Sequence, residues 1–365
     1  MRILYGVQGT GNGHISRCRS VAEALARKGV EVDYLLSGRP ANGYFDMQAF
    51  GHYRAVPGLT FASRDGELAL WQTLRQNQPR RFWQDLTTLE LEGYDRIISD
   101  FEPVTAWAAR RRGLKSIGIS HQAAFRYAIP RKGEDIASRL VMRHYAPVDQ
   151  AIGLHWFHFG FPILPPVVDE IRLAPEDGTL LVYLPFESLP AIHDLLSRFA
   201  SVRFVCFHPE VQQAESLGNI SLFPLSREHF KQALARSSGV ISNAGFELAS
   251  EALTLGKKLL LKPLQGQFEQ ATNAFTLEML GLARVMQSLD PGAVRGWLDS
   301  EAPGVVKYPD VAEGIANWLA ADTQEPVALL IERMWRKVSF PETVCDRLAE
   351  LGMADSLNCS LLLQS

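Results

Sequence analysis

The 365-residue sequence contains few cysteines and no long apolar segment. Its cysteines are far apart and form no Cys-x-x-Cys pair, so neither a disulfide framework nor a zinc site is predicted, and reduced thiols in a cytoplasmic protein are expected. No segment approaches the roughly 20 apolar residues of a membrane span, and glycines interrupt the short N-terminal apolar stretch, unlike a signal peptide. The cysteines are Cys18, Cys206, Cys345 and Cys359.

The sequence also lacks an excess of positive charge. It has 37 Lys and Arg against 40 Asp and Glu, a formal net charge of -3. Nucleic-acid-binding domains are usually strongly basic, so no nucleic-acid partner is predicted. Hydrophobic residues make up 47% and charged residues 21%, which is typical of a globular protein, and the length fits two domains of roughly 150 residues each.

Short apolar runs alternate with amphipathic stretches, a pattern typical of parallel sheets covered by helices. We therefore expect an α/β protein, with a first helix over residues 16–28 that ends at Gly29 and a later helix over about 189–199. The expected strands are residues 2–7, 30–36, 94–99 and 115–119 in the first half and residues 179–184, 202–207, 239–242 and 258–262 in the second.

A proline-rich segment, GFPILPPVV at residues 160–168, separates the two halves. Its three closely spaced prolines cannot continue a helix or a central strand, so we interpret residues 161–175 as a linker. The predicted plan is a first domain over 1–160 and a second over 176–325. Residues 326–365, with a helix near 326–337, are expected to pack back on the first domain.

A glycine loop, GTGNGH, follows the first strand and precedes the first helix. Glycines let backbone N–H groups approach a ligand, and a helix N-terminus favours negative charge. A dinucleotide-binding loop would have a third glycine in place of His14, and Arg39 follows the second strand where NAD sites have an acidic residue. NAD is therefore disfavoured, while the arginine leaves NADP open. The loop residues singled out are Gly9, Gly11, Asn12 and Gly13.

His14 is the candidate catalytic base, because it stands where a strand meets a helix and an imidazole can accept a proton at neutral pH. Asp100 follows a predicted strand at the same edge of the sheet and could orient that base. A helix-start histidine that only packs, and an aspartate that only caps a turn or helix, are the simpler alternatives. Glu102 lies close to Asp100 in the sequence.

The second half contains a comparable strand, turn and helix in GVISNAGFELASEALTLG, residues 239–256. The turn at Asn243, Gly245 and Phe246 would place a helix N-terminus against a diphosphate. Glu251 lies too deep in this helix for capping and could accept hydrogen bonds from ribose hydroxyls. The alternative is an exposed helix glutamate, as expected for Glu247 one turn earlier.

A polar loop, LQGQFEQ, follows the strand at residues 258–262 and precedes another helix. Amide and carboxylate side chains supply both donors and acceptors, which suits the several hydroxyl groups of a sugar. The residues that would contact the sugar are Gln267, Glu269 and Gln270.

The pattern GxxxxxE, then a strand, a proline and (D/E)Q-x-x-NA resembles the donor-binding region of GT-B glycosyltransferases. It is similar to the peptidoglycan N-acetylglucosaminyltransferase group, to the UDP-dependent glycosyltransferases, and to a bacterial and archaeal set whose N-terminus reads much like LYGVQGTGNGH. The resemblance implies two Rossmann-like βαβ domains facing each other across a cleft. Asn243 replaces a histidine of plant-type members, and GTGNGH is one residue longer than the GTGGH of the peptidoglycan enzyme.

The resemblance also assigns roles to the matched positions. Glu251 would bind the ribose, Glu269 and Gln270 the sugar hydroxyls, and the turn at Gly245 and Phe246 the diphosphate. His14 would be the base and Asp100 its partner. These roles imply transfer of a hexosyl or N-acetylhexosaminyl group from a UDP-linked donor by inverting displacement, with no cofactor and, since no DxD element occurs, no metal site.

Two other functions remain open from the sequence: a nucleotide-sugar epimerase of the same fold, and a non-catalytic nucleotide-sugar-binding protein. The acceptor is not specified. Residues 75–83 and 125–143 mix arginines with aromatics, which suggests contact with an anionic membrane surface or a lipid-linked acceptor at the inner face of the membrane. A solvated helix face with core aromatics explains the same pattern.

Overall fold

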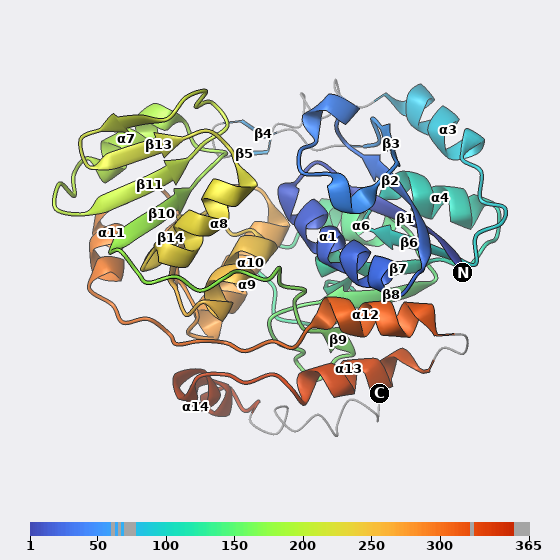
Figure 1. Cartoon of the computed structure of the whole chain (residues 1–365). Helices are drawn as coiled ribbons and strands as arrows, with labels where there is room; N and C mark the ends of the chain where they lie inside the picture. Colours follow the sequence, from blue (N-terminus) through green and yellow to red (C-terminus); the bar gives the residue numbers. More distant parts are fainter. Residues whose placement is uncertain (60–62, 65–66, 69–77, 322–324, 354–365) are drawn as a thin grey trace.

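The computed structural model describes residues 1–59, 63–64, 67–68, 78–321 and 325–353. The chain forms two lobes, each built on a sheet, and the two sheets stand on either side of a central group of helices (Figure 1). Within the described residues, each large sheet has seven strands. This is the α/β, two-sheet fold expected from the sequence.

The sheet of the first lobe is parallel throughout and has the order β3-β2-β1-β6-β7-β8-β9. Tyr5 in the centre of β1 pairs with Tyr34 of β2 on one side and Ile98 of β6 on the other. The strands are β1 (Arg2–Gln8), β2 (Glu31–Ser37), β3 (Tyr53–Val56), β6 (Arg96–Asp100), β7 (Ile117–Ser120), β8 (Gln150–Leu154) and β9 (Ile163–Leu164).

Helices and short turns connect these strands. Their bounds are α1 (Asn12–Arg27), η1 (Ala41–Gly43), η2 (Gln48–Phe50), α3 (Pro79–Thr88), α4 (Pro103–Arg111), α5 (His121–Ala124) and α6 (Ile136–His144), with a small hairpin of β4 (Ser63–Arg64) and β5 (Glu67–Leu68). The first helix starts at Asn12 and not at Ser16, because Gly11 is the extended N-cap and the asparagine and glycine that follow it form the first turn. It ends near the predicted Gly29, whose φ is +67°.

The sheet of the second lobe has the order β12-β13-β11-β10-β14-β15-β16 and is parallel except for β12. Its central strands fall close to the predicted positions. The elements are β10 (Thr179–Tyr183), α7 (Leu189–Leu196), β11 (Arg203–Phe207), β12 (Glu215–Leu217), β13 (Ile220–Phe223), α8 (Arg227–Arg236), β14 (Gly239–Ser242), α9 (Phe246–Thr254), β15 (Lys258–Leu261), α10 (Phe268–Met279), β16 (Arg284–Val285) and α11 (Pro291–Leu298).

The chain then returns to the first lobe earlier than predicted. Helix α12 (Val311–Ala320), assigned from the sequence to the second domain, packs along α1 (Figure 1). Its Glu313 accepts hydrogen bonds from Lys28 and, at 3.0 Å, from Arg27. The apolar face of α12, which includes Ile315 and Leu319, requires this contact to be buried.

The predicted linker also contains a strand. Ile163 and Leu164 form β9 at the edge of the first sheet, where flanking prolines are tolerated because one side of the strand needs no partner. Helix α13 (Val327–Trp335) packs against β9, and its Trp335 donates a hydrogen bond to the Ile163 carbonyl at 2.5 Å. The last described helix is α14 (Glu342–Glu350).

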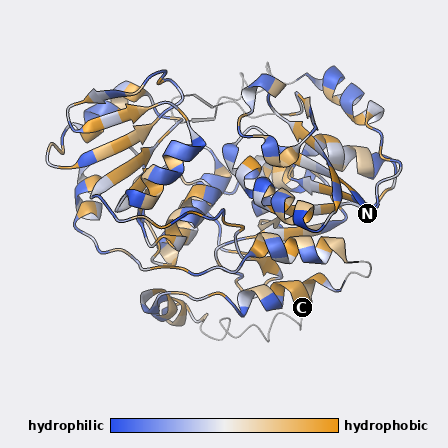
Figure 2. Ribbon diagram, in the orientation of Figure 1, coloured by the Kyte–Doolittle hydropathy of each residue, from blue (hydrophilic) through white to orange (hydrophobic). Residues whose placement is uncertain are grey.

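Apolar residues concentrate in the sheets and on the inner sides of the helices, whereas the outer helix faces are hydrophilic (Figure 2). One buried cluster joins both lobes, since it contains Ile15 of α1, Trp156 after β8 and Phe246 of α9. Among the described residues, no helix combines the length and apolar character that crossing a bilayer requires. The shared cluster shows that the two lobes are packed against each other through apolar side chains.

Candidate functional site

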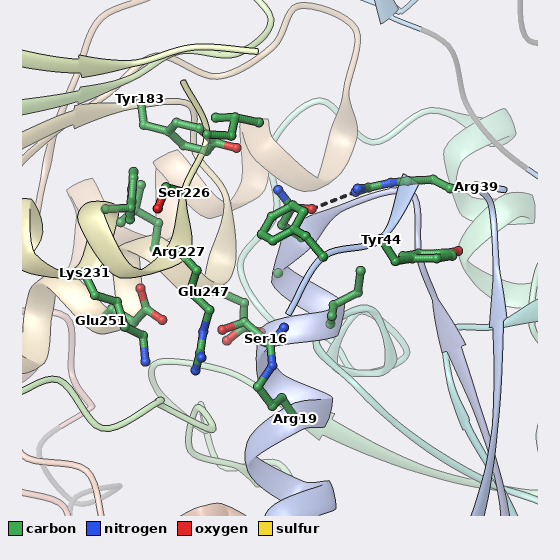
Figure 3. A pocket seen from close by; sticks show the side chains of 17 residues that line it. Ser16, Arg19, Arg39, Tyr44, Tyr183, Ser226, Arg227, Lys231, Glu247 and Glu251 are labelled. Carbon is green, nitrogen blue, oxygen red and sulfur yellow. Dashed lines mark hydrogen bonds between the residues drawn. The ribbon is translucent and has the colours of Figure 1, made fainter. Parts of the chain in front are cut away.

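The carboxyl ends of both sheets border a cavity of about 160 Å³ between the lobes (Figure 3). Helix α1 forms one wall, and α8 and α9 form the other. Basic side chains enter it from both lobes: Arg19 and Arg39 from the first, Arg227 and Lys231 from the second. The remaining lining residues are Asn12, Gly13, Ile15, Ser16, Tyr44, Phe45, Tyr183, Leu225, Ser226, Phe230, Glu247, Leu248 and Glu251.

The structure brings the predicted base and its partner together. His14 lies in the first turn of α1, and Asp100 is the last residue of β6, which neighbours β1. The Nδ1 atom of His14 is 2.8 Å from Oδ1 of Asp100. Nδ1 also lies 2.9 Å from Nη2 of Arg17, and Nε2 lies 3.4 Å from Nε2 of Gln122. A carboxylate can only accept, so the contact with Asp100 places the proton of a neutral His14 on Nδ1 and its lone pair on Nε2.

Asp100 is fully buried and charged. Burial alone would raise the pKa of its carboxyl, but the positive charge of Arg17 and the hydrogen bonds from His14 and Arg17 outweigh it and hold the pKa well below its usual range. Arg17 donates from Nε to Oδ2 at 2.8 Å and from Nη2 to Oδ1 at 2.7 Å, and the thiol of Cys18 donates to Oδ2 at 3.0 Å.

Glu102 performs the capping role that was the alternative for Asp100. Its carboxylate accepts hydrogen bonds from the N–H groups of Val104 at 2.7 Å and Thr105 at 2.6 Å, at the start of α4. These contacts satisfy two of the unpaired donors of a helix N-terminus. Glu102 therefore caps α4, and the carboxylate of Asp100 accepts hydrogen bonds from His14 and Arg17 of α1 instead.

Arg17 was not singled out from the sequence, and Glu247 was expected to be exposed. Instead Glu247 is 8% exposed and accepts a hydrogen bond from Nη1 of Arg17, across the boundary between the lobes. Burial and the nearby charges of Glu251 and Asp100 raise the pKa of Glu247 to about 8, although Arg17 opposes this rise. The prediction for Glu247 was wrong because α1 covers the face of α9 that carries it.

The glycines of the first loop have different physical roles. A side chain at Gly9 would overlap the ring of Tyr44, and one at Gly13 would come within 2.9 Å of Glu247 Cγ, so both permit close packing. Gly11 faces open space, with only His14 at 4.0 Å. Asn12 lines the cavity and accepts a hydrogen bond from Arg39 at 2.9 Å.

Glu251 lies in the cavity, as its predicted contact with a ligand requires. Its side chain faces a basic group of Lys231, Arg227 and Arg19 (Figure 3). Burial raises the pKa of Glu251 to about 7, with the basic group acting in the opposite direction. A carboxylate in such a position is able to accept hydrogen bonds from two neighbouring hydroxyl groups.

The predicted diphosphate turn is only partly open. Gly245, the N-cap of α9, has no atom close to where a side chain would begin. The side chain of Phe246 instead points into the core and stacks on His121 with ring centroids 3.9 Å apart. Asn243 donates to the Lys262 carbonyl at 2.8 Å, and its buried Oδ1 has no hydrogen-bond partner among the residues that the structure describes. A ligand here would meet backbone N–H groups, not the ring of Phe246.

The predicted sugar-binding residues separate into two groups. Gln270 is buried and accepts a hydrogen bond from the N–H of Leu264 at 2.9 Å, so it orders the preceding loop. Glu269 faces the first lobe and accepts a hydrogen bond from Gln122 at 3.0 Å. Gln267 is the N-cap of α10 but makes no capping bond, and its buried Oε1 has no partner.

Gln122 was missed by the sequence reasoning. It lies on α5, is buried, and places its Nε2 3.4 Å from Nε2 of His14 while donating to Glu269. Its own Oε1 has no partner. Only its position after a strand end, beyond β7, could have indicated a site residue. The structure thus connects the candidate base with a candidate sugar-binding residue of the other lobe.

Among the described residues, no group of three or more His, Cys, Asp or Glu side chains is arranged to hold a metal ion. The charged atoms at the cavity are the four basic side chains and the carboxylates of Glu247 and Glu251. This set is suited to an anion that also carries hydroxyl groups.

The model of the family described as Glycosyl transferase family 1 matches residues 1–300. No curated protein matches the sequence significantly.

Several solved structures are similar over nearly the whole chain. They include the glycotransferase of kitacinnamycin, with 15% identity and a TM-score of 0.57 over 98% of this chain and 97% of that one. The calicheamicin glycosyltransferase CalG4 has 16% identity and a TM-score of 0.53 over 98% and 97%. Phytolacca americana UGT2, complexed with UDP-2-fluoro-glucose and pterostilbene, has 12% identity and a TM-score of 0.56 over 96% and 98%. These likenesses confirm the expected GT-B fold.

We expect Asp100→Asn to lower the free energy of unfolding at pH 7 by about 3–5 kcal/mol, because Arg17 loses a buried carboxylate to which it donates two hydrogen bonds. The folded-state pKa of Asp100 is depressed, so its contribution is fully present above the unfolded value of about 3.9 and is lost as the pH falls below it.

Chemical denaturation of both proteins at pH 7, 5 and 4 measures this effect. The difference between them should be constant from pH 7 to 5 and smaller at pH 4. Asp194→Asn, at an exposed side chain, should change stability by no more than about 0.5 kcal/mol. A difference for Asp100→Asn that does not exceed that of Asp194→Asn would contradict the assignment.

Proposed function

Because this chain belongs to glycosyl transferase family 1, we propose that it transfers a hexosyl or N-acetylhexosaminyl group from a UDP-linked donor to an acceptor hydroxyl. The observation that carries this proposal is the pairing of the buried Asp100 with His14, which lies in the same turn of α1 as the cavity-lining residues Gly13 and Ile15. The pairing leaves Nε2 of His14 facing Gln122, whose amide nitrogen also donates to Glu269 of the second lobe, and a sugar bound by Glu269 would stand near this nitrogen.

In the proposed reaction, Nε2 of His14 accepts the proton of the acceptor hydroxyl. The acceptor oxygen attacks the anomeric carbon from the face opposite the diphosphate, and the electron pair of the breaking C–O bond leaves with the diphosphate. The configuration at that carbon is thereby inverted. Asp100 stabilises the imidazolium form of His14 during transfer without taking its proton.

The donor is assigned to the second lobe. Glu251 would accept hydrogen bonds from the two ribose hydroxyls, and the open turn at Gly245 would offer backbone N–H groups to the diphosphate. The positive end of α9 and the basic side chains of the cavity would stabilise the leaving group. We assign no metal ion or cofactor to this step. UDP is proposed as the carrier because Phytolacca americana UGT2 was solved with a UDP-sugar analogue.

The acceptor is proposed to be lipid-linked and to approach from α6. Ile136 and Leu140 lie one turn apart on this helix and are 77% and 53% exposed, next to Arg139 and Arg143. An exposed apolar pair flanked by arginines is suited to an anionic membrane surface. The loop before α6 reaches the donor lobe through hydrogen bonds between Lys132 and Thr272.

The other sequence stretch proposed for this role is less suitable. Residues 75–77 lie outside the described residues. Arg81 of α3 pairs with Asp85 at 3.3 Å, but Arg139 of α6 likewise pairs with Glu134 at 3.0 Å, so ion pairing does not distinguish the two helices. The exposed ring of Trp83 in α3, however, is covered on one face by Arg111, 4.6 Å from its centroid. We therefore place the membrane-facing surface at α6.

Calorimetric titration with UDP, GDP, dTDP and NADP should show tight binding of UDP, weakened about 10- to 100-fold by Glu251→Ala, because charged hydrogen bonds to the ribose are lost. Glu278→Ala, at an exposed glutamate of α10, should bind UDP like the wild type. Binding of NADP alone would overturn the glycosyltransferase proposal.

With the donor sugar identified, His14→Gln should lower kcat by about 10²- to 10⁴-fold, because the glutamine amide cannot accept the proton that the imidazole accepts. Its affinity for UDP should stay within about 3-fold of the wild-type value, since Glu251 and α9 are unchanged. His52→Gln, at an exposed histidine, should keep the wild-type kcat. Full transfer activity in His14→Gln would show that His14 is not the base.

Co-sedimentation with phosphatidylglycerol vesicles tests the surface at α6. The wild type should bind, and Ile136→Ser/Leu140→Ser and Arg139→Glu/Arg143→Glu should each reduce binding about 10-fold or more, because one removes apolar contact and the other reverses the charge. Lys115→Glu, exposed elsewhere on the first lobe, is the control. If the wild type does not bind vesicles, a membrane-borne acceptor is ruled out.

A further inference from the structure

The guanidinium group of Arg17 joins the two lobes beneath the proposed base. Its Nε and Nη2 donate to the two oxygens of Asp100 in the first lobe, at 2.8 and 2.7 Å. Its Nη1 donates to Oε1 of Glu247 in the second lobe. Arg17 is 3% exposed, Glu247 is 8% exposed and Asp100 is inaccessible to solvent. One side chain therefore contacts carboxylates of both lobes in a buried setting.

Arg17 fixes the position of the Asp100 carboxylate, which contacts the proposed base His14. It stands one helical turn after His14, so both side chains reach Asp100 from the same face of α1. Oδ1 of Asp100 accepts hydrogen bonds from both of them, and Nη2 of Arg17 also lies 2.9 Å from Nδ1 of His14, so the two donors converge on this oxygen. A bidentate guanidinium fork fixes the plane of a carboxylate, and that plane sets the direction in which His14 Nδ1–H must point.

Glu247 connects Arg17 and Asp100 to the second lobe, the proposed donor lobe, because it accepts a hydrogen bond from Arg17. It is in the first turn of α9, immediately after the turn proposed to bind the diphosphate. Gly13 permits the approach, since a side chain there would lie 2.9 Å from Glu247 Cγ. The bond from Arg17 to Glu247 thus requires α9 to stand directly against the first turn of α1.

Stability alone is a weak reason to bury these groups. Desolvation of a buried ion pair offsets most of its Coulombic attraction, and apolar side chains of similar volume commonly stabilise a fold as well or better. What an apolar group cannot supply is direction. The guanidinium fork supplies that direction at the carboxylate of Asp100, which contacts His14.

We propose that Arg17 is a positioning residue for His14 and that Glu247 completes its placement from the donor lobe, so that the base is correctly oriented only when the lobes meet. The inference rests on the proposed function in that His14 is taken as the base. It adds a link between the donor helix and the orientation of the imidazole that operates through Arg17 and Asp100.

The tautomer of neutral His14 tests this link without any assay of activity. Nitrogen-15 NMR, with the His14 signals identified by their loss in His14→Gln, should show the wild type with the proton on Nδ1. Arg17→Lys should give a mixture of tautomers, because an ammonium group cannot bond both oxygens of Asp100 and reach Glu247. Glu247→Ala should also give a mixture, whereas Glu247→Gln, which keeps an accepting oxygen, should resemble the wild type.

Arg19→Lys is the matched control, because Arg19 is buried on the same helix but donates to the Asp46 carbonyl. It should leave the His14 tautomer unchanged. Arg17→Lys combined with Glu247→Ala should perturb the tautomer no more than Arg17→Lys alone, since both act through one group. A wild-type tautomer in either Arg17→Lys or Glu247→Ala would overturn the proposal, and thermal unfolding checks that each variant is folded.

Kinetics then separates positioning from binding. Arg17→Lys and Glu247→Ala should lower kcat about 10- to 100-fold and change the Kd for UDP by less than about 3-fold. Loss of UDP affinity equal to the loss of kcat would indicate a structural role and contradict the inference. Absence of transfer by the wild type would refute the proposed function, whereas the tautomer result would still decide whether Arg17 positions His14.

Discussion

The buried negative charge of Asp100 is the constraint on which the arrangement of the site depends. A charge without solvent must be paired and fully hydrogen-bonded. Here His14, Arg17 and Cys18 all contribute, and their spacing of three and four residues places them on one face of α1. Helix α1 is therefore fixed in rotation about its axis. That rotation also turns Arg19 and Ser16 toward the cavity and leaves one guanidinium nitrogen of Arg17 for the second lobe.

The two-sheet fold and part of the site could be predicted from the sequence, because they depend on local residue patterns and on the order of neighbouring strands. Short apolar runs located the strands, and parallel strands present their carboxyl ends at one edge. His14 and Asp100 follow strands β1 and β6, which are neighbours in the sheet, so their meeting followed from the pattern. The start of α1 was placed four residues late because two glycines near it were interpreted as loop.

Contacts between the two lobes could not be predicted in this way, because they join residues that are far apart in the sequence and lie in different sheets. Glu247 and Glu251 occupy the same amphipathic helix, and nothing local shows that both are buried at the cavity, where Glu247 meets Arg17 of α1 and Glu251 faces basic side chains. Phe246 was assigned to a ligand but completes the aromatic packing around His121, which belongs to the other lobe. Gln122 follows β7, the neighbour of β6 in the first sheet, and meets Glu269 only because the two lobes are in contact. The return of α12 to α1 depended on long-range burial in the same way.

That return has a mechanical consequence. The chain passes between the lobes twice, once after β9 and once before α12, and the second passage is pinned where Val306 donates to the Leu253 carbonyl and Lys307 pairs with Ser339. Two points of attachment define a line. Sliding one lobe past the other would stretch a crossing, and a swing about this line would break the buried contacts of Arg17 with Glu247 and of Trp156 with Ser250. The connectivity and the buried contacts thus oppose different displacements of the lobes.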